Sequence, residues 1–177
     1  MFVMPSTGLP HPEVRSEAEP RRTRDASAAK AQLYRDLAAQ LKSLIDGEPD
    51  RTANAANMAA LIYHGLPDLN WAGFYFAQGQ ELVLGPFQGQ PACVRIPWGD
   101  GVCGTAASRA ATVLVRDVHE FPGHIACDPV SQSELVVPLI ENGKVTGVLD
   151  LDSPKLARFD ADDQAGCEHL VAVFLGS

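Results

Sequence analysis

The sequence is short of positive charge and of long hydrophobic runs, and each shortage excludes a class of function. Only 14 Lys and Arg residues stand against 22 Asp and Glu, so the net charge is −8. Such a balance speaks against nucleic acid or an anionic membrane surface as the main partner. The longest apolar runs, such as LVVPLI (135–140), are far too short to cross a bilayer. The first residues lack the basic and long apolar segments of a secretory signal, so we expect a cytoplasmic protein.

Cysteine is also scarce, and its spacing lacks the C-x-x-C pairs that zinc sites usually show. The chain has four cysteines, and Cys93, Cys103 and Cys127 are separated by 10 and 24 residues. In a cytoplasmic chain this number argues against a permanent disulfide framework. The cysteines are therefore core thiols, metal ligands or a transient redox set; because the C-x-x-C pairs are missing, we expect neither a metal site nor a bound cofactor.

The N-terminal part contains two helical patterns behind a leader. Residues 1–26 mix Pro, Ser, Glu and Arg without apolar periodicity and are predicted to form a flexible leader. From Ser27 onward one helical face carries Leu33, Leu37, Leu41, Leu44 and Ile45, and Gly47 ends the helix. Residues 50–65 predict a second helix whose inward face carries Ala55, Ala59, Ile62 and Tyr63.

The rest of the chain alternates short strands with turns. Strands are predicted at 69–77, 81–87, 92–98 and 112–118, and residues 133–153 form a hairpin that turns at ENGK (141–144). Residues 99–110 are a glycine-rich loop leading into a short helix, and a long loop follows at 118–132. The last helix, at 160–176, has Cys167, Leu170, Val171 and Phe174 on its apolar face. The pattern predicts an α+β protein whose central antiparallel sheet is flanked by N- and C-terminal helices.

Three of the cysteines lie where a reactive thiol would be useful. Cys167 lies on the apolar stripe of the last helix and is predicted to be a core residue. Cys93 and Cys103 lie at strand or helix ends, and Cys127 lies in a polar loop. His124 is close enough in sequence to lower the pKa of Cys127, and helix-end amides are expected to stabilise a Cys103 thiolate. These residues alone leave redox chemistry and a structural role both open.

Acids and aromatic residues also recur on single strand faces. In VLDLDS (148–153), Asp150 and Asp152 point to the same side of a strand, and Glu134 begins the preceding one. The three acids are either the solvated side of an amphipathic strand or a cup that binds a cationic group. In such a cup, a carboxyl with a raised pKa could also protonate a leaving oxygen. Trp71 and Tyr75 share one face of their strand and are either core residues or the wall of a pocket.

Four segments together resemble a known family. They are NWAGFYF (70–76), GPFQGQPACVRIPWGDGVCGTAA (85–107), FPGHIACDPVSQSELVVPL (121–139) and GVLDLDS (147–153). They are similar to the free methionine-(R)-sulfoxide reductases, which are GAF-domain enzymes, from about residue 30 to residue 175. The resemblance implies a single GAF domain over residues 27–177, preceded by the leader.

The resemblance also implies a role for each candidate residue. Cys127 matches the cysteine that attacks the sulfoxide and becomes a sulfenic acid, Cys103 the principal resolving cysteine, and Cys93 an additional recycling cysteine. Glu134, Asp150 and Asp152 match acids that bind the substrate amino group and polarise the sulfoxide, and Trp71 and Tyr75 match pocket aromatics. The implied substrate is free methionine-R-sulfoxide, and the implied reductant is thioredoxin.

Two further expectations concern alternatives and assembly. The competing interpretation is a GAF module that senses a small ligand or an oxidant; the three cysteines and the acids weigh against it. We also expect a homodimer, because GAF domains commonly pair through their helices and the first helix has a long apolar stripe.

Overall fold

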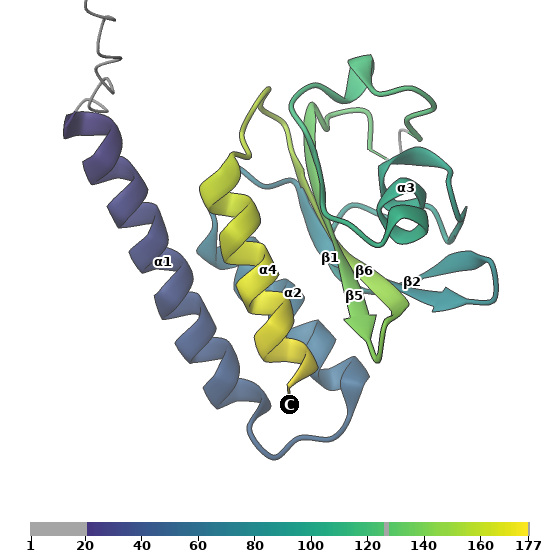
Figure 1. Cartoon of the computed structure of the whole chain (residues 1–177), viewed down its shortest axis with the longest axis horizontal. Helices are drawn as coiled ribbons and strands as arrows, with labels where there is room; N and C mark the ends of the chain where they lie inside the picture. The colour runs from purple at the N-terminus through teal and green to yellow at the C-terminus, as the bar shows by residue number, and fades with distance from the viewer. Residues whose placement is uncertain (1–20, 126–127, 177) are drawn as a thin grey trace, which may run out of the picture.

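The fold places three helices on one face of a six-stranded sheet and a fourth helix on the other (Figure 1). The structure is a computed structural model, and it describes residues 21–125 and 128–176. The helices are α1 (Arg21–Ile45), α2 (Arg51–Gly65), α3 (Gly101–Arg109) and α4 (Ala161–Leu175). The first, second and fourth pack together on one side, and α3 lies on the opposite side with the loops that surround it.

The sheet is antiparallel throughout, with strand order β3-β2-β1-β6-β5-β4. Its strands are β1 (Trp71–Gln78), β2 (Glu81–Gly89), β3 (Arg95–Pro97), β4 (Val113–Val115), β5 (Ser133–Glu141) and β6 (Lys144–Ser153). Two hairpins, β1–β2 and β5–β6, meet along the central β1–β6 pair. The predicted α+β architecture with one central antiparallel sheet is therefore confirmed.

Local sequence explains where two of the helices begin. Asp50 caps α2 by accepting a hydrogen bond from the Ala53 amide, and Asp160 caps α4 through a reciprocal capping box with Asp163. These caps satisfy amides that have no partner within the helix. The observed start of each helix is within one residue of the start that the sequence predicts.

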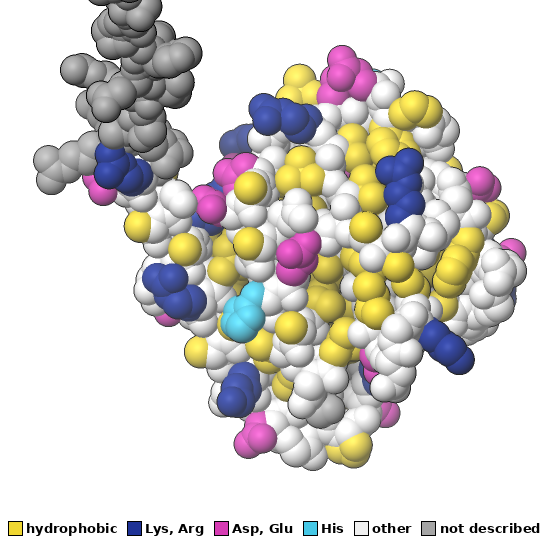
Figure 2. Space-filling model, viewed as in Figure 1, with side chains coloured by type: hydrophobic (Ala, Val, Ile, Leu, Met, Phe, Trp, Pro, Cys, Tyr) yellow, Lys and Arg dark blue, Asp and Glu magenta, His cyan; other side chains and the backbone are white. Residues whose placement is uncertain are grey.

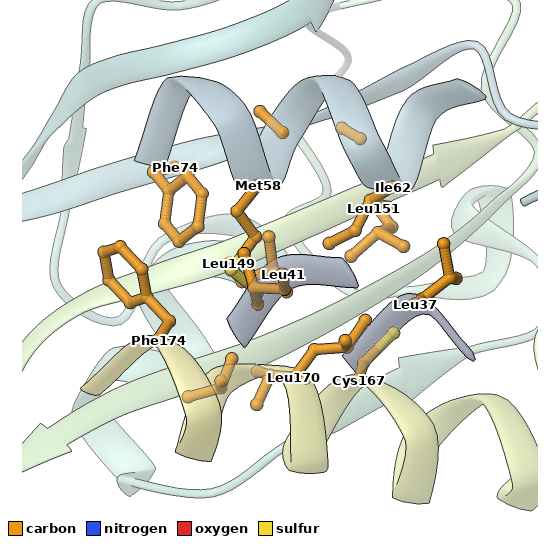
Figure 3. Close-up of a cluster of buried hydrophobic side chains, with 14 of the residues drawn as sticks. Leu37, Leu41, Met58, Ile62, Phe74, Leu149, Leu151, Cys167, Leu170 and Phe174 are labelled. Atoms are coloured by element: carbon orange, nitrogen blue, oxygen red, sulfur yellow. The ribbon is translucent and has the colours of Figure 1, made fainter. Parts of the chain in front are cut away.

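The larger of two hydrophobic clusters lies between the three helices and the sheet. Figure 3 shows Leu37 and Leu41 of α1 close to Met58 and Ile62 of α2, with Cys167, Leu170 and Phe174 of α4 beside them. Phe74, Leu149 and Leu151 contribute the sheet side of this cluster. Cys167 is fully buried, with its Sγ 3.8 Å from the Tyr34 hydroxyl, and its predicted role as a core residue is confirmed.

Several predicted boundaries were wrong. The first helix begins at Arg21, so residues 21–26 are helical and not part of a leader; residues 1–20 lie outside the described part of the chain. Residues 24–26 are exposed, and a helical segment that buries no face has no apolar periodicity to detect. Leu44 was predicted to face inward but is 51% exposed.

The two edge strands are shorter than predicted. β3 and β4 each have three residues, where seven were predicted, because each pairs with its single neighbour at only three positions. Edge strands pair on one side only, so pairing limits them more than composition does.

Charges are dispersed on the face that Figure 2 shows. Basic and acidic side chains alternate there in small groups, and no large area of a single sign is visible. Within the described residues, no helix combines the length and the apolar character that a membrane span requires.

Candidate active site

The second cluster of buried residues, on the α3 side of the sheet, contains the predicted site. Trp71 and Tyr75 belong to it together with Cys103 of α3, whereas their neighbours Ala72 and Phe74 face the other cluster. This division follows from the alternation of side chains along β1. The predicted face of Trp71 and Tyr75 is confirmed.

Strand register aligns the acids with Trp71 across three strands. Trp71 lies opposite Asp152 of β6, and Asp152 lies opposite Glu134 of β5. Asp150 lies two residues earlier on β6, opposite Gly73 and Val136. Side chains at paired positions share a face, so Glu134, Asp150 and Asp152 all lie on the face that carries Trp71.

The three acids are not the solvated side of a strand. Glu134 and Asp150 are each only 6% exposed, and Asp152 is partly buried. The remaining alternative, an acidic cup, is therefore the one that the geometry supports. The Oδ1 atom of Asp150 is buried and accepts no hydrogen bond from the residues that the structure describes, so one strong acceptor is left for a ligand.

These side chains line one pocket between β1, β5, β6 and α3. It is lined by Trp71, Tyr75, Asp100, Cys103, His124, Asp128, Ser131, Glu134, Asp150 and Asp152, together with Gly101 and apolar residues. The pocket leaves about 30 Å³ for the centres of water-sized molecules. It is thus a narrow acidic pocket with one aromatic wall and, among the described residues, one thiol.

The aromatic wall is held rigidly. The Trp71 ring stacks on Tyr75 and Phe87, with centroid distances of 5.8 and 5.3 Å, and its Nε1 donates to the Gln90 carbonyl at 3.1 Å. Glycine is required at position 73, because a Cβ there would lie 2.6 Å from the Trp71 ring and 2.3 Å from the Phe87 Cβ. The indole is therefore fixed before any ligand binds.

Burial and mutual repulsion raise the pKa values of all three acids. Burial first, and then the charge of Asp152, raises the pKa of Glu134 well above its ordinary value. Burial and the charge of Glu134 raise the pKa of Asp150, and burial and the charge of Asp150 raise that of Asp152. Carboxyl groups of this kind can donate a proton near neutral pH or bind a cation.

Cys103 differs from the expectation that helix-end amides stabilise its thiolate. Burial first, and then the charges of Asp150 and Glu134, raise the pKa of Cys103 well above the usual value. Its Sγ lies 4.0 Å from Oε1 of Glu134. The expected thiolate stabilisation is therefore wrong, because burial of the thiol, together with the charges of two buried carboxyl groups, outweighs the first turn of a short helix.

The other predicted thiols are placed differently. Cys93 follows the pocket residue Ala92 and is disulfide-bonded, whereas Cys103 and Cys167 carry free thiols. Cys127 lies outside the described residues. His124 is near the acids, with Nε2 3.5 Å from Oε2 of Glu134, and partial burial lowers its pKa.

Sequence reasoning missed a polar network that holds the loop after residue 127 against the sheet. The Nδ2 atom of Asn70 donates to Oδ2 of Asp128 and to Oγ of Ser131, both at 2.9 Å. Ser131 in turn hydrogen-bonds Asp152. No local pattern predicts these contacts, because Asn70 and Ser131 are 61 residues apart.

Fold and site together define a GAF-domain protein, and the family model for the GAF domain matches residues 52–173. The free methionine-R-sulfoxide reductase of Escherichia coli is 50% identical over 81% of this chain and 87% of its own length. That of Saccharomyces cerevisiae is 45% identical over 80% and 83%. The solved structure of free methionine-R-sulfoxide reductase from Neisseria meningitidis, in complex with its substrate, is 46% identical with a TM-score of 0.81, covering 83% of this chain and 89% of that one.

The chain therefore belongs to the free methionine-R-sulfoxide reductase family of GAF-domain proteins.

Proposed function

We propose that this protein reduces free L-methionine (R)-sulfoxide to L-methionine by thiol chemistry. The single observation that carries the proposal is the pocket itself: three acids, two stacked aromatic residues and a thiol meet in it. The named activity of relatives that are 45–50% identical supports it.

The acids explain a preference for the free amino acid. An α-ammonium group is a cation that buried carboxylates bind well, and a peptide bond would remove that charge. The Oδ1 atom of Asp150, which has no hydrogen-bond partner among the described residues, is one acceptor for such a group. The apolar face of Trp71, held by its contacts with Phe87 and Gln90, suits the S-methyl group of the substrate.

In the proposed first step, the Cys127 thiolate attacks the sulfoxide sulfur. The attack forms an S–S bond to the substrate, the S–O bond breaks, and the oxygen leaves as water after protonation. A water molecule then attacks the Cys127 sulfur, which breaks the S–S bond, leaves Cys127 as a sulfenic acid and releases the sulfide as methionine. The departing oxygen needs a proton or a strong hydrogen bond in the transition state. Glu134 and Asp152, whose raised pKa values keep protons available, are proposed to supply it, and Asp150 mainly binds substrate.

In the second step, a resolving thiol attacks the sulfenic acid, forming a disulfide and releasing water. We assign this role to Cys103. Its raised pKa argues against a role as the first nucleophile, and the Glu134 carboxylate, 4.0 Å away, can accept its proton when it reacts. Cys93 is proposed as a recycling cysteine; its disulfide-bonded state supports a redox role. Thioredoxin then restores the dithiol by exchange.

We further propose that the protein acts as a homodimer in the cytoplasm, where a reducing pool can recycle it. The apolar face of α1 is buried against α2 and α4, so a dimer would use other surfaces. If light scattering gives the molar mass of a single chain at micromolar concentration, the protein is a monomer and the proposed dimer is contradicted.

The decisive experiment is thioredoxin-coupled oxidation of NADPH with three substrates side by side. Free methionine-R-sulfoxide should be reduced, whereas the S epimer and a peptide-bound sulfoxide should not. Equal rates with all three would remove the proposed specificity, and no rate with any would favour the alternative of a sensor module.

A further inference from the structure

We propose that Cys103, Glu134 and Asp150 form an inhibitory binding site for a thiophilic divalent cation, with Zn²⁺ as the preferred ion. One sulfur and two carboxylate oxygens of these residues lie within 4.8 Å of one another, and all three residues are buried. Zinc binding to the reduced protein is independent of the proposed function, whereas the inhibitory role rests on it.

The distances suit a tetrahedral ion after small side-chain adjustments. Zinc binds thiolate at about 2.3 Å and carboxylate oxygen at about 2.0 Å, so tetrahedral geometry holds the two donors about 3.5 Å apart. The observed separation of Cys103 Sγ and Glu134 Oε1 is 4.0 Å. A shift of a few tenths of an ångström would therefore bring both atoms into coordination.

A second observation points independently to a ligand. Asp150 is only 6% exposed, lines the same pocket, and within residues 21–125 and 128–176 nothing hydrogen-bonds its Oδ1 atom. A buried carboxylate oxygen without a partner costs stability unless a cation or a donor binds it. Zinc would satisfy this oxygen and remove the repulsion between Asp150 and Glu134 at the same time.

The pocket also has room for the ion. A cavity needs roughly 10–15 Å³ of space for the centre of a water molecule, and the corresponding volume of this pocket is about 30 Å³. An ion and one water therefore fit, and the water can occupy the fourth coordination position that a three-ligand zinc site leaves open. The partly buried His124 lines this side of the pocket as well.

The donor set selects among cations. A thiolate ligand favours soft or borderline ions such as Zn²⁺, whereas Mg²⁺ and Ca²⁺ prefer oxygen alone. Binding requires the Cys103 thiol to release its proton, which zinc can replace. Such an ion would occupy the acids that we assign to substrate and mask the thiol that we assign to resolution, so it should inhibit reversibly.

The binding test uses the full chain, metal-free and reduced with a phosphine, carrying Cys93→Ser and Cys127→Ser so that other loop thiols cannot bind zinc. We expect one Zn²⁺ per chain by competition with a chromophoric chelator, and a thiolate-to-metal charge-transfer band with Co²⁺. Loss of outer-shell contacts weakens metal sites about 10–100-fold, so adding Cys103→Ser, which removes a ligand, should weaken binding by at least about a hundredfold.

Asp150→Asn serves as the second variant and should also weaken zinc binding, and circular dichroism checks that both variants fold. Cys167→Ser, a buried thiol on the other side of the sheet, is the matched control and should bind zinc normally. Zinc binding unaffected by both Cys103→Ser and Asp150→Asn, absent altogether, or matched by Mg²⁺ would overturn the proposal.

The inhibition test uses the unmodified chain. Zinc should inhibit turnover of free methionine-R-sulfoxide, and a chelator should restore it. An enzyme that binds zinc as predicted but has no reductase activity would contradict the proposed function and leave the cation site intact. An active enzyme that zinc does not inhibit would overturn the inhibitory role.

Discussion

Replacing Glu134 with Gln should slow the chemical step by about a hundredfold or more without destabilising the protein. The substitution keeps the shape of a side chain that is only 6% exposed, but removes a carboxyl group that can give up a proton. Loss of a general acid typically costs about 10²–10⁴ in rate. A hundredfold loss corresponds to about 2.7 kcal/mol of transition-state stabilisation.

The effect should appear in the rate and not in binding. An interaction made only in the transition state lowers the rate of the chemical step, whereas uniform binding affects KM. Asp152→Asn should behave like Glu134→Gln, and Asp150→Asn should mainly weaken substrate binding. Glu168→Gln, on the exposed side of α4, is a control for the loss of one negative charge and should leave the rate unchanged.

The pH dependence provides a second readout. Burial and the Asp152 charge raise the pKa of Glu134, so its protonated form persists to higher pH, and the rate should fall as pH rises through the folded-state pKa. Glu134→Gln should lose much of this alkaline decline. The same raised pKa links the stability of the protein to pH. The contribution of Glu134 to stability is fully present below its unfolded-state pKa of about 4.3, and it is lost as the pH rises through the folded-state pKa. Above that range the Gln variant should be at least as stable as the parent.

The assay is single-turnover reduction at saturating free methionine-R-sulfoxide, measured by rapid quench, with thermal unfolding of each variant alongside. At this chain length, 1 kcal/mol corresponds to roughly 2–4 °C in Tm, so a stability change is readily seen. Near-normal single-turnover rates for Glu134→Gln and Asp152→Asn would refute the reasoning and leave both residues as ligands of the amino group.

Three further variants separate the roles of the thiols and of the loop. Cys127→Ser should release no methionine even in a single turnover; one methionine per chain would mean that another residue is the nucleophile. Cys103→Ser should perform the first step at a near-normal rate but fail to turn over with thioredoxin, and a dimedone probe should label Cys127; full turnover would transfer the resolving role to Cys93. Asn70→Ala removes two 2.9 Å hydrogen bonds, to Asp128 and Ser131, and should lower the single-turnover rate about tenfold or more at little cost in KM. An unchanged rate with a lowered Tm would give Asn70 a purely structural role.

Local patterns identified the helices, the strands and the faces of β1 and β6, but not the start of α1 or the lengths of the two edge strands. Apolar residues at helical spacing identified α2 and α4, and alternation along β1 and β6 assigned Trp71, Tyr75, Asp150 and Asp152 to single faces. These features depend on the geometry of one segment, so its own residues determine them. The family resemblance added the substrate and the roles, which no pattern of burial or spacing could have supplied.

Only the tertiary structure decided which residues meet and in which charge state. Register across β1, β6 and β5 brings Trp71, Asp152 and Glu134 into line, and the packing of α3 brings Cys103 to within 4.0 Å of Glu134. The sequence predicted a stabilised Cys103 thiolate because the helix end is a local feature, whereas the opposing carboxyl groups come from strands more than 30 residues away. Burial and the distance between charges set a pKa, and both depend on the packed fold.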